Sequence, residues 1–436
     1  MTTDTVLQIS SDSVRAFSEQ LGEPGWLTEL RLEALEAAKK LELPKVEKTK
    51  INRWRLERFG QFHQEQPLQS LDELPSEIND LIQSNDGSDK RNLYVQRNGS
   101  MVYRQLSDEL KQQGVIFTEM NTAVKEHPEL VKKYFLQVIQ KDESRLTALH
   151  AALWSGGVFL YVPKNTEVSM PLQALFISDD RERVFSPHVL IVADANSSVT
   201  YVGSYASTDS DVELVHNGMV EIVAEAGARV QYAAVHNLSA SITDLSLRRA
   251  VVQNDASIEW IVGEMNAGNC LSETSSVLKG NGSKSDAKVV CIGEGSHDLN
   301  ITTRAVHIGK SSDSNMLTRA VMRDEAQAII NGITKIEKGA TNANGEQTER
   351  VLMLSPKARG DANPLLLIDE DEVTAGHAAS AGQVDKEQIY YLMSRGVTRQ
   401  EAEKLIIIGF LQPIVSEIPI ESVKEQLSAL IERKLQ

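Results

Sequence analysis

The sequence predicts a mainly β protein in which a stack of short strands is flanked by helical regions at both ends of the chain. Residues 158–367 are rich in Val, Ile and Thr and carry few long helical patterns. Short alternating apolar runs recur there, and they begin at Val199, Val230, Ile258, Val289 and Leu317. Successive runs start 31, 28, 31 and 28 residues apart. A strand repeat near ~30 residues is typical of a stacked β-solenoid.

A β-sandwich is the alternative, but its turn signals usually recur every ~8–12 residues. Small or polar residues precede most of the runs, at 195–197, 226–228, 255–257 and 285–287. The longer period therefore favours the solenoid, in which each coil buries its inward residues against its neighbours.

Residues 1–155 are predicted to form a helical and mixed region. Apolar residues recur at three- and four-residue steps from Trp26 to Ala38, and a second helical pattern runs from about 121 to 154. The segment between them, 68–89, is rich in Asp, Ser, Asn and Gly and is predicted to be loop or short helix. Two glycines at 156 and 157 close the region, so the β core is assigned to 156–374.

Residues 375–436 are predicted to form a C-terminal helical region. Asp385 with Gln388, and Thr398 with Glu401, have the spacing of N-terminal capping boxes. The helix that begins at Thr398 is apolar on more than one face, and Pro413 is expected to break or kink it. A third helix is predicted from 421 to about 435.

Composition excludes several function classes. The chain has 61 Asp and Glu against 45 Lys and Arg, a net charge of −16 and a pI of about 5.1. Such acidity disfavours binding to nucleic acid or to anionic lipid. The longest apolar stretch, 405–411, is far short of the ~20 residues that a membrane helix needs. With no secretory signal visible and only two cysteines, the chain is expected to be cytoplasmic.

No catalytic motif stands out, so we do not expect an enzyme. The sequence lacks a Gly-x-Ser-x-Gly elbow and a His-Glu-x-x-His motif, and the phosphate-loop candidate at 309–311 lacks its first glycine. Cys291 and His297, with the carboxylates Glu294 and Asp298, could supply ligands to a metal. A coil turn with a buried thiol is favoured over that site, and Cys270 is expected to be an inert thiol in a turn.

His377 occupies a different context from the other histidines. It follows the acidic run 369–372 and lies within the small-residue segment 374–382. Small neighbours allow another chain to approach closely, and nearby carboxylates raise the basicity of an imidazole. On the residues alone a packing or loop role is favoured, and a functional role stays open.

The region around His377 resembles the C-terminal signature of the SufB/SufD family of iron–sulfur assembly proteins. The segments that carry this resemblance are LLLIDEDEV at 365–373, His377, GQVD at 382–385 and YLMSRGV at 391–397. The similarity extends backward to TERVLMLSPKA at 348–358, NGI at 331–333, SHD at 296–298 and GGVFLYVP at 156–163. An N-terminal pattern is similar to the SufD branch and consists of Glu23, Pro24, Trp26, Leu27, Arg31, Ala34 and Leu35.

The resemblance implies a right-handed parallel β-helix in a cytoplasmic complex with SufB and two copies of the SufC ATPase. SufB and SufD would pair through their β-helix ends, the C-terminal helices would hold the ATPase, and ATP would bind to SufC. A nascent cluster would form at the SufB–SufD interface, where His377 falls on the family's interface histidine, opposite a cysteine of SufB. Many SufD relatives carry a cysteine two residues before this histidine, and this chain has Ala375 there.

The resemblance and the residues together predict a non-catalytic scaffold. A conventional cluster needs about four cysteine thiolates, so this chain would bind no cofactor alone and would share a cluster transiently with SufB. Whether a flavin binds the complex stays open. The contribution at the interface would rest on His377, with Cys291 and His297 as weaker candidates.

Two surfaces are predicted to contact partners. The ATPase would dock on the C-terminal helices, through Leu405, Ile406, Phe410, Tyr391 and Arg395. The alternative is that the apolar helix packs on the chain's own solenoid, and both can hold for different faces. Strands near 351–354 and 365–368 would pair with SufB by strand addition. A homo-oligomeric structural protein, or a homodimer of the chain when alone, stays open, whereas a carbohydrate-active β-helix enzyme is disfavoured because such enzymes are typically secreted.

Overall fold

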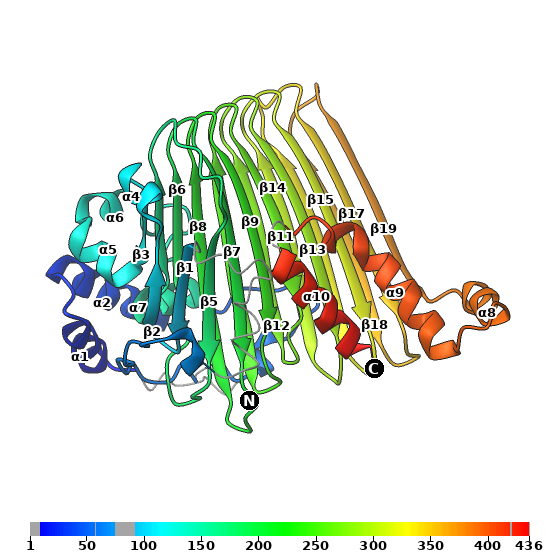
Figure 1. The fold of residues 1–436 in the computed structure, drawn as a ribbon. Coiled ribbons are helices and arrows are strands. Elements are labelled where there is room, and N and C mark those ends of the chain that lie inside the picture. Colours follow the sequence, from blue (N-terminus) through cyan, green and yellow to red (C-terminus); the bar gives the residue numbers. More distant parts are fainter. Residues whose placement is uncertain (1–8, 57, 75–91, 419–420, 436) are drawn as a thin grey trace.

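The computed structural model describes residues 9–56, 58–74, 92–418 and 421–435, and two long sheets dominate it (Figure 1). In spatial order the ten-stranded sheet contains β19 (Thr374–Gln383), β17 (Asn344–Met353), β15 (Asp313–Met322), β13 (Lys284–Gly293), β11 (Ser257–Glu264), β9 (Arg229–Asn237), β7 (Ser198–Ser207), β5 (Leu172–Ser178), β1 (Asn92–Arg97) and β2 (Ser100–Gln105). The nine-stranded sheet contains β18 (Arg359–Ile368), β16 (Gln327–Ile336), β14 (Asp298–His307), β12 (Cys270–Leu278), β10 (Ile242–Val252), β8 (Leu214–Ala224), β6 (His188–Ala193), β4 (Val158–Val162) and β3 (Ile116–Glu119).

The chain alternates between the two sheets, so that each coil adds one strand to each of them. From β4 onward every pair of neighbouring strands along the stack is parallel, while β1–β2 and β3–β4 are antiparallel. This arrangement confirms the predicted parallel β-solenoid and excludes the sandwich, in which antiparallel sheets pack face to face.

The five predicted runs all lie in the ten-stranded sheet, and the structure corrects their spacing. Val199 is in register with Val230, and Val230 with Ile258. Ile258, however, pairs with Ser285, so Val289 faces Val262 instead. The sequence count is wrong here because β13 opens with the polar residues Lys284, Ser285 and Asp286, so its apolar run begins inside the strand.

One corner of the solenoid repeats the same turn in successive coils. The residues with left-handed backbone at this corner are Asn165, Asn196, Gly227, Asp255, Gly282, Ser311 and Asn342. Each donates its backbone N–H to a carbonyl of the next coil, as Asn196 does to Ala226 (2.9 Å). Asn, Asp and Gly adopt this conformation at low cost. The turn predicted at 285–287 is wrong, because those residues lie inside β13 and the corner is at Gly282.

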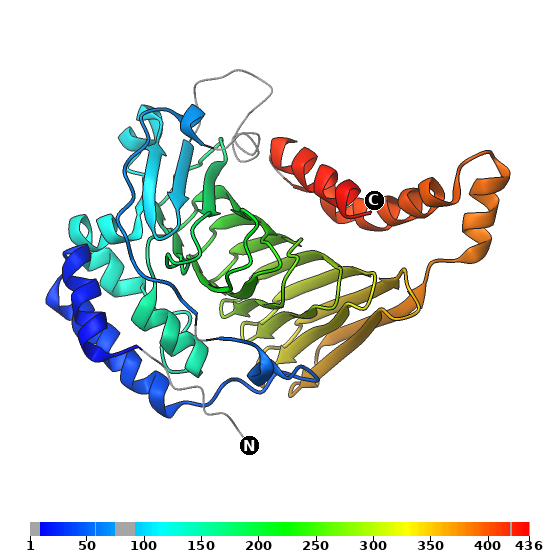
Figure 2. The same cartoon turned by 90° about the horizontal axis from the view of Figure 1, so that it is seen from below.

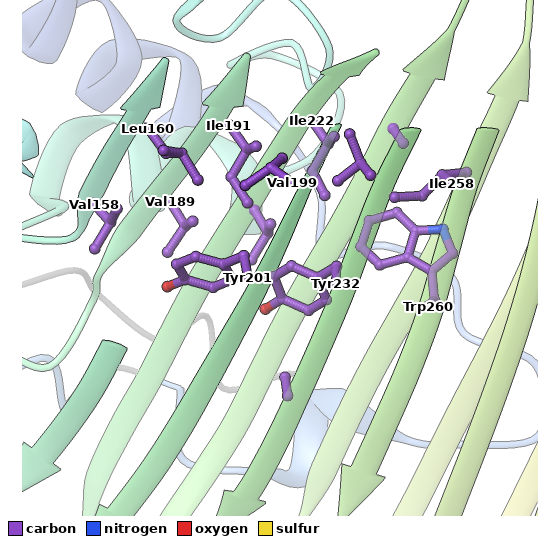
Figure 3. Packing of buried hydrophobic residues seen from close by; sticks show 14 of the residues in the cluster. Val158, Leu160, Val189, Ile191, Val199, Tyr201, Ile222, Tyr232, Ile258 and Trp260 are labelled. Atoms are coloured by element: carbon purple, nitrogen blue, oxygen red, sulfur yellow. The ribbon is translucent and has the colours of Figure 1, made fainter. Parts of the chain in front are cut away.

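The interior between the sheets is filled by stacked side chains (Figure 3). Tyr201, Tyr232 and Trp260 lie above one another on successive strands, with ring centroids 5.5 and 5.2 Å apart. All three are fully buried. Burying a large apolar side chain contributes about 1.5–3 kcal/mol, so each coil is held mainly by the coils on either side of it.

Helices of the N-terminal region cover the outer face of the nine-stranded sheet (Figure 2). Residues 68–74 of the same region pack instead on β1 and β5 of the ten-stranded sheet. The helical elements of this region are α1 (Ser11–Leu21), α2 (Gly25–Lys40), η1 (Ile51–Arg53), η2 (Leu71–Glu73), α4 (Asp108–Gln112), α5 (Met120–Glu126), α6 (Pro128–Tyr134) and α7 (Arg145–Leu153). Glu23 and Arg31 form a buried ion pair at 2.6 Å, and Arg31 also donates to the Ala152 carbonyl (3.1 Å). The hydrogen bond from Arg31 to Ala152 ties α2 to the end of α7. Most of the segment 68–89 lies outside the described residues.

The C-terminal helices are α8 (Lys386–Ser394), α9 (Arg399–Val415) and α10 (Glu421–Lys434), and α9 and α10 cross the outer face of the ten-stranded sheet (Figures 1 and 2). The capping box of Thr398 and Glu401 is confirmed, with each backbone N–H bonded to the other side chain. Asp385 caps α8 through the Glu387 N–H (2.8 Å), and no bond from Gln388 completes a box. α9 continues past Pro413 to Val415, so the proline does not end the helix.

The boundary predicted between 155 and 156 falls in the loop between α7 and β4, whereas the one between 374 and 375 falls inside a strand. β1, β2 and β3 lie within 1–155 and pair with the first solenoid strands, and the boundary at 375 falls in β19. No helix in the described part of the chain is both long and apolar enough to cross a membrane.

Candidate interface site at the open end of the solenoid

β18 and β19 form the last rung of the solenoid, and among the described residues each has a hydrogen-bonded neighbour on one side only. The prediction that 365–368 lies at an edge is confirmed, because these residues belong to β18. The prediction that 351–354 lies at an edge is wrong, because β17 pairs with both β15 and β19. The last rung therefore exposes two strand edges of ten residues each.

His377 lies in the middle of β19, in register with Gln347 of β17. Gln347 is 1% exposed and points into the solenoid. Because side chains in register on neighbouring parallel strands project from the same face, the exposed His377 lies on the interior face of the last rung. Ala375, two residues earlier, lies on the same face, so a cysteine there would stand beside the imidazole.

The rung below His377 carries two polar side chains on its interior face. Gln347 accepts a bond from Thr334 (2.8 Å) and donates to the Gly332 carbonyl (3.3 Å). Glu349 is 1% exposed, and neither carboxyl oxygen has a hydrogen-bond partner among the described residues. Burial raises the pKa of Glu349 to about 7. Sequence reasoning missed this residue, although the alternation of Gln347, Glu349 and Val351 in one strand could have placed it inward.

The last rung also exposes large apolar side chains on both of its faces. Leu365 and Leu367, on the outer face, are 40% and 47% exposed, and Ile368, on the inner face, is 41% exposed. Its register partner Ile336, one coil earlier, is fully buried. The exposure thus comes from the position at the end of the stack.

The two weaker candidate ligands lie away from this rung. Cys291 is fully buried in an apolar interior cluster on β13, and burial raises the pKa of its thiol well above the usual range. His297 lies in the turn between β13 and β14, where burial lowers its pKa. Cys270 was predicted in a turn but begins β12, buried 3.7 Å from the Asn266 amide nitrogen.

A buried polar network lies deeper in the solenoid and was missed by sequence reasoning. Asp244 accepts bonds from the Nδ1 atoms of His216 (2.7 Å) and His236 (3.0 Å), and Arg248 donates to His236 Nε2 (2.7 Å) and to Glu264 (3.0 Å). Although burial raises it, contact with the two histidines leaves the pKa of Asp244 well below its usual range. His216, His236 and Asp244 are close enough to hold a metal ion. Arg248 occupies His236 Nε2 and balances the Glu264 carboxylate, whereas His216 Nε2 is buried without a hydrogen-bond partner among the described residues.

The residues predicted to bind the ATPase fall into two groups. Tyr391 on α8 and Leu405 on α9 are 58% and 53% exposed, and Arg395 is exposed above the Tyr391 ring. Ile406 and Phe410 are half-buried, and the Phe410 ring lies 5.3 Å from the guanidinium of Arg319 of the chain's own sheet.

The opposite face of α9 packs on the solenoid. Ile407 and Leu411 are buried against Ile261, Val290 and Val321 of the ten-stranded sheet. One face of the helix therefore docks on its own chain, and another remains exposed.

Two family models match the chain. Residues 176–410 match the SufBD core domain of SUF system FeS cluster assembly, and residues 19–174 match the SufBD protein N-terminal region. The chain is 49% identical over 438 residues to iron–sulfur cluster assembly protein SufD of Bacillus subtilis (strain 168), covering 100% of both chains. It is 27% identical over 424 residues to an iron–sulfur cluster assembly SufBD family protein of Staphylococcus aureus (strain USA300), covering 96% of this chain and 91% of the relative. With both halves of its length matched, the chain belongs to the SufBD family of iron–sulfur cluster assembly proteins.

Proposed function

We propose that the chain is a non-catalytic scaffold subunit of a cytoplasmic Suf complex. It pairs with a SufB-like paralogue through the last rung, so that a nascent iron–sulfur cluster forms at the shared interface beside His377. The observation that carries this proposal is the combination of two unpaired strand edges with an exposed, inward-facing histidine on the same rung.

The edges support pairing with another solenoid end. A long, apolar, unpaired edge is a template for strand addition, and proteins usually shorten, charge or cover such edges. Here both edges are ten residues long, and Leu365, Leu367 and Ile368 are exposed beside them. A partner that presents an equivalent rung would satisfy the backbone groups and bury the apolar side chains.

The cluster ligands that this chain can offer favour pairing with a different protein over pairing with a second copy of the same chain. The interior face of the last rung offers His377 and, at 375, an alanine, while both thiols of the chain are buried elsewhere. Because a cluster needs about four ligands, mostly thiolates, the remaining ligands must come from the partner. Pairing of two identical chains would bring together two histidines and no cysteine.

The exposed surface of α8 and α9 is proposed to bind a SufC-like ATPase, two copies of which enter each complex and carry the ATP. Aromatic residues, Met and Arg are enriched in protein interfaces. This surface carries Tyr390, Tyr391, Met393, Arg395 and Leu405, all of them exposed.

The test is the mass of the chain co-expressed with its SufB-like and SufC-like partners, measured by size-exclusion chromatography with light scattering. We expect one copy of this chain, one of the paralogue and two of the ATPase. Tyr391→Asp and Leu405→Asp should release the ATPase, while Arg433→Asp, at an exposed position of α10, should not. These positions are sharper probes than Ile406 or Phe410, where a charge would also disturb packing on the chain's own sheet.

Two outcomes would contradict the proposal. If the chain binds neither partner and forms a homodimer, the scaffold proposal is replaced by a homo-oligomeric β-solenoid without a cluster role. If the complex assembles but His377→Ala forms clusters at the original rate and yield, the interface assignment of His377 fails.

A further inference from the structure

A segment of the N-terminal region crosses the outer face of the nine-stranded sheet and reaches the last rung of the solenoid. This segment, 44–50, follows α2 and extends toward the yellow strands near the open end (Figure 2). We infer that Lys48 of this segment and three asparagines, Asn300, Asn331 and Asn363, form a clamp that positions β18 for pairing with the paralogue. The inference rests on the proposed function, because it concerns a strand at which the two chains would pair.

The Lys48 side chain contacts the first half of β18. Its Nζ atom donates to Asn363 Oδ1 (2.8 Å) and lies 3.5 Å from Asp361 Oδ2, a carboxylate oxygen that also pairs with Arg359 (2.9 Å). An isolated, partly exposed ion pair contributes little to stability, so the contact with Asp361 alone would not hold a strand in place. The hydrogen bond to Asn363 differs because it is the first member of a longer series of bonds.

The three asparagines connect β18 back to the segment that carries the lysine. Asn363 donates to Asn331 Oδ1 (3.1 Å), and Asn331 donates to Asn300 Oδ1 (3.1 Å). Asn300, on β14, donates to the Glu47 carbonyl (3.1 Å) and to Thr49 Oγ1 (2.8 Å), on either side of the lysine. The series therefore closes on itself. All of its donors run in one direction, an arrangement in which each hydrogen bond polarises the next.

Polar bonds fix the tip of the segment, while apolar contacts hold its two ends. Leu41 and Leu43 pack into an apolar cluster before the segment, and Trp54 packs into the same cluster after it. Between them, residues 44–47 form one wall of a cavity of about 490 Å³ whose other walls include the sheet. Lys48 has left-handed backbone (φ +54°). A non-glycine residue keeps this unfavourable conformation where the surrounding contacts require it, which here are the bonds of the clamp.

The clamp holds one half of β18 and leaves the other half free for a partner. Asp361 and Asn363 are half-buried, whereas Leu365, Leu367 and Ile368 are exposed. Among the described residues β18 pairs with one neighbouring strand only, so the clamp supports a strand that lacks a second neighbour. A strand edge that is already ordered before its partner arrives binds more tightly, because less conformational freedom is lost on binding.

The position of the clamp separates it from the proposed ATPase surface. Segment 44–50 crosses the nine-stranded sheet, whereas α9 and α10 cross the ten-stranded sheet. Loss of the clamp should therefore weaken binding of the paralogue and leave binding of the ATPase unchanged. A variant that merely destabilised the whole fold would weaken both interactions, so this difference identifies a positioning role.

The first measurement is hydrogen exchange of the full-length chain without partners. Lys48→Met keeps the length of the side chain and removes its charge. Because losing a hydrogen bond to a charged group shifts a local equilibrium by about tenfold, we expect exchange across 359–364 to become faster by that factor and exchange across 374–383 to stay unchanged. Asn331→Ala should have the same effect from the middle of the ladder. Lys45→Met is the matched control, because Lys45 is an exposed lysine of the same segment.

The second measurement is the affinity of the same variants for the SufB-like paralogue and for the SufC-like ATPase. When the binding-competent state is populated to about a tenth, the apparent affinity falls about tenfold. Lys48→Met and Asn331→Ala should each show this loss with the paralogue and keep the parent affinity for the ATPase. Lys48→Met combined with Asn363→Ala should lose less than the two single variants together, because both break the same bond. Circular dichroism and thermal unfolding check the overall fold of each variant.

The outcomes separate this inference from the proposed function. Unchanged exchange across 359–364 in both Lys48→Met and Asn331→Ala would overturn the clamp, whether or not the complex assembles. Faster exchange with unchanged affinity for the paralogue, or an equal loss of affinity for the ATPase, would overturn its positioning role. If the variants show the expected exchange but the parent chain never binds the paralogue, the proposed pairing fails and the positioning role with it, while the clamp on β18 stands.

Discussion

At the scale of single residues, the two thiols of the chain are packed away from solvent. Cys270 and Cys291 are fully buried, and burial raises the pKa of both thiols above the usual range. Because the thiolate is the reactive form, we predict no reaction with a chromogenic disulfide reagent in the folded chain and two reacting thiols after denaturation. Rapid modification of one thiol in the native protein would contradict this placement.

His307 is predicted to make the fold sensitive to acid. It is fully buried, its ring nitrogens contact the hydroxyls of Ser312 (2.9 Å) and Ser314 (2.8 Å), and burial lowers its pKa to about 4. The unfolded histidine titrates near ~6.5. Between these values the unfolded state binds more protons, so the contribution of His307 is complete above pH 6.5 and is lost as the pH falls toward 4.

The loss amounts to about 2 kcal/mol by pH 5. Urea unfolding at pH 7.5 and pH 5 measures it. His307→Asn, which has no proton to gain in this range, should lose less stability between the two pH values than the parent chain does. An equal loss in both proteins would show that His307 is not the group responsible.

Sequence reasoning singled out His377 as a candidate and missed Glu349, and the reason is physical. His377 stands out locally, between an acidic run and a small-residue segment. The environment of Glu349 depends on Gly332, on a strand of the opposite sheet, and on Thr318, one coil earlier. No local pattern reveals that a carboxyl group is buried without a partner.

At the scale of elements, one face of α9 is predicted to stabilise the fold, and the opposite face is predicted to contribute little to stability. Leu411 is fully buried against the ten-stranded sheet, so Leu411→Ala should cost about 2–5 kcal/mol. Leu405→Ala, on the exposed face of the same helix, should change stability by less than about 0.5 kcal/mol. Urea unfolding of the isolated chain compares them. Equal effects of the two variants would mean that α9 does not dock through this face.

The helices and strands were largely predictable from sequence, and the failures follow from long-range packing. The cap at Thr398 depends on residues three positions apart and was correctly predicted. What α9 packs against depends on Val290 and Val321, which lie about a hundred residues earlier in the chain. The corner at Gly282 was misplaced because Lys284, Ser285 and Asp286 resemble a turn until the pairing of β13 with β11 shows that they belong to the strand.

At the scale of the whole molecule, protection of the backbone amides from hydrogen exchange should decline sharply at the open end of the solenoid. The interior coils are bonded on both sides, whereas β18 and β19 are bonded on one side only. We predict fast hydrogen exchange across 359–383 in the isolated chain, slow exchange in β9–β13, and slowing of 359–383 alone when a SufB-like partner binds. Peptides of α1 and α2 serve as the unchanged control. Uniform protection along the stack of the isolated chain would contradict an exposed last rung.

The attachment of α8 has a mechanical consequence. Residues 384–385 join it to β19, and residues 395–398 join it to α9, whose apolar contacts, together with those of α10, spread across β7, β9, β11, β13 and β15. A force applied to α8 is therefore shared between two attachments. One is the broad set of α9 and α10 contacts on the middle of the stack, here called the anchor, and the other is β19, the last strand of the sheet. Displacement concentrates on β19, which would slide along β17 while the anchor holds still. The last rung is thus the part of the solenoid that a pull on α8 strains first.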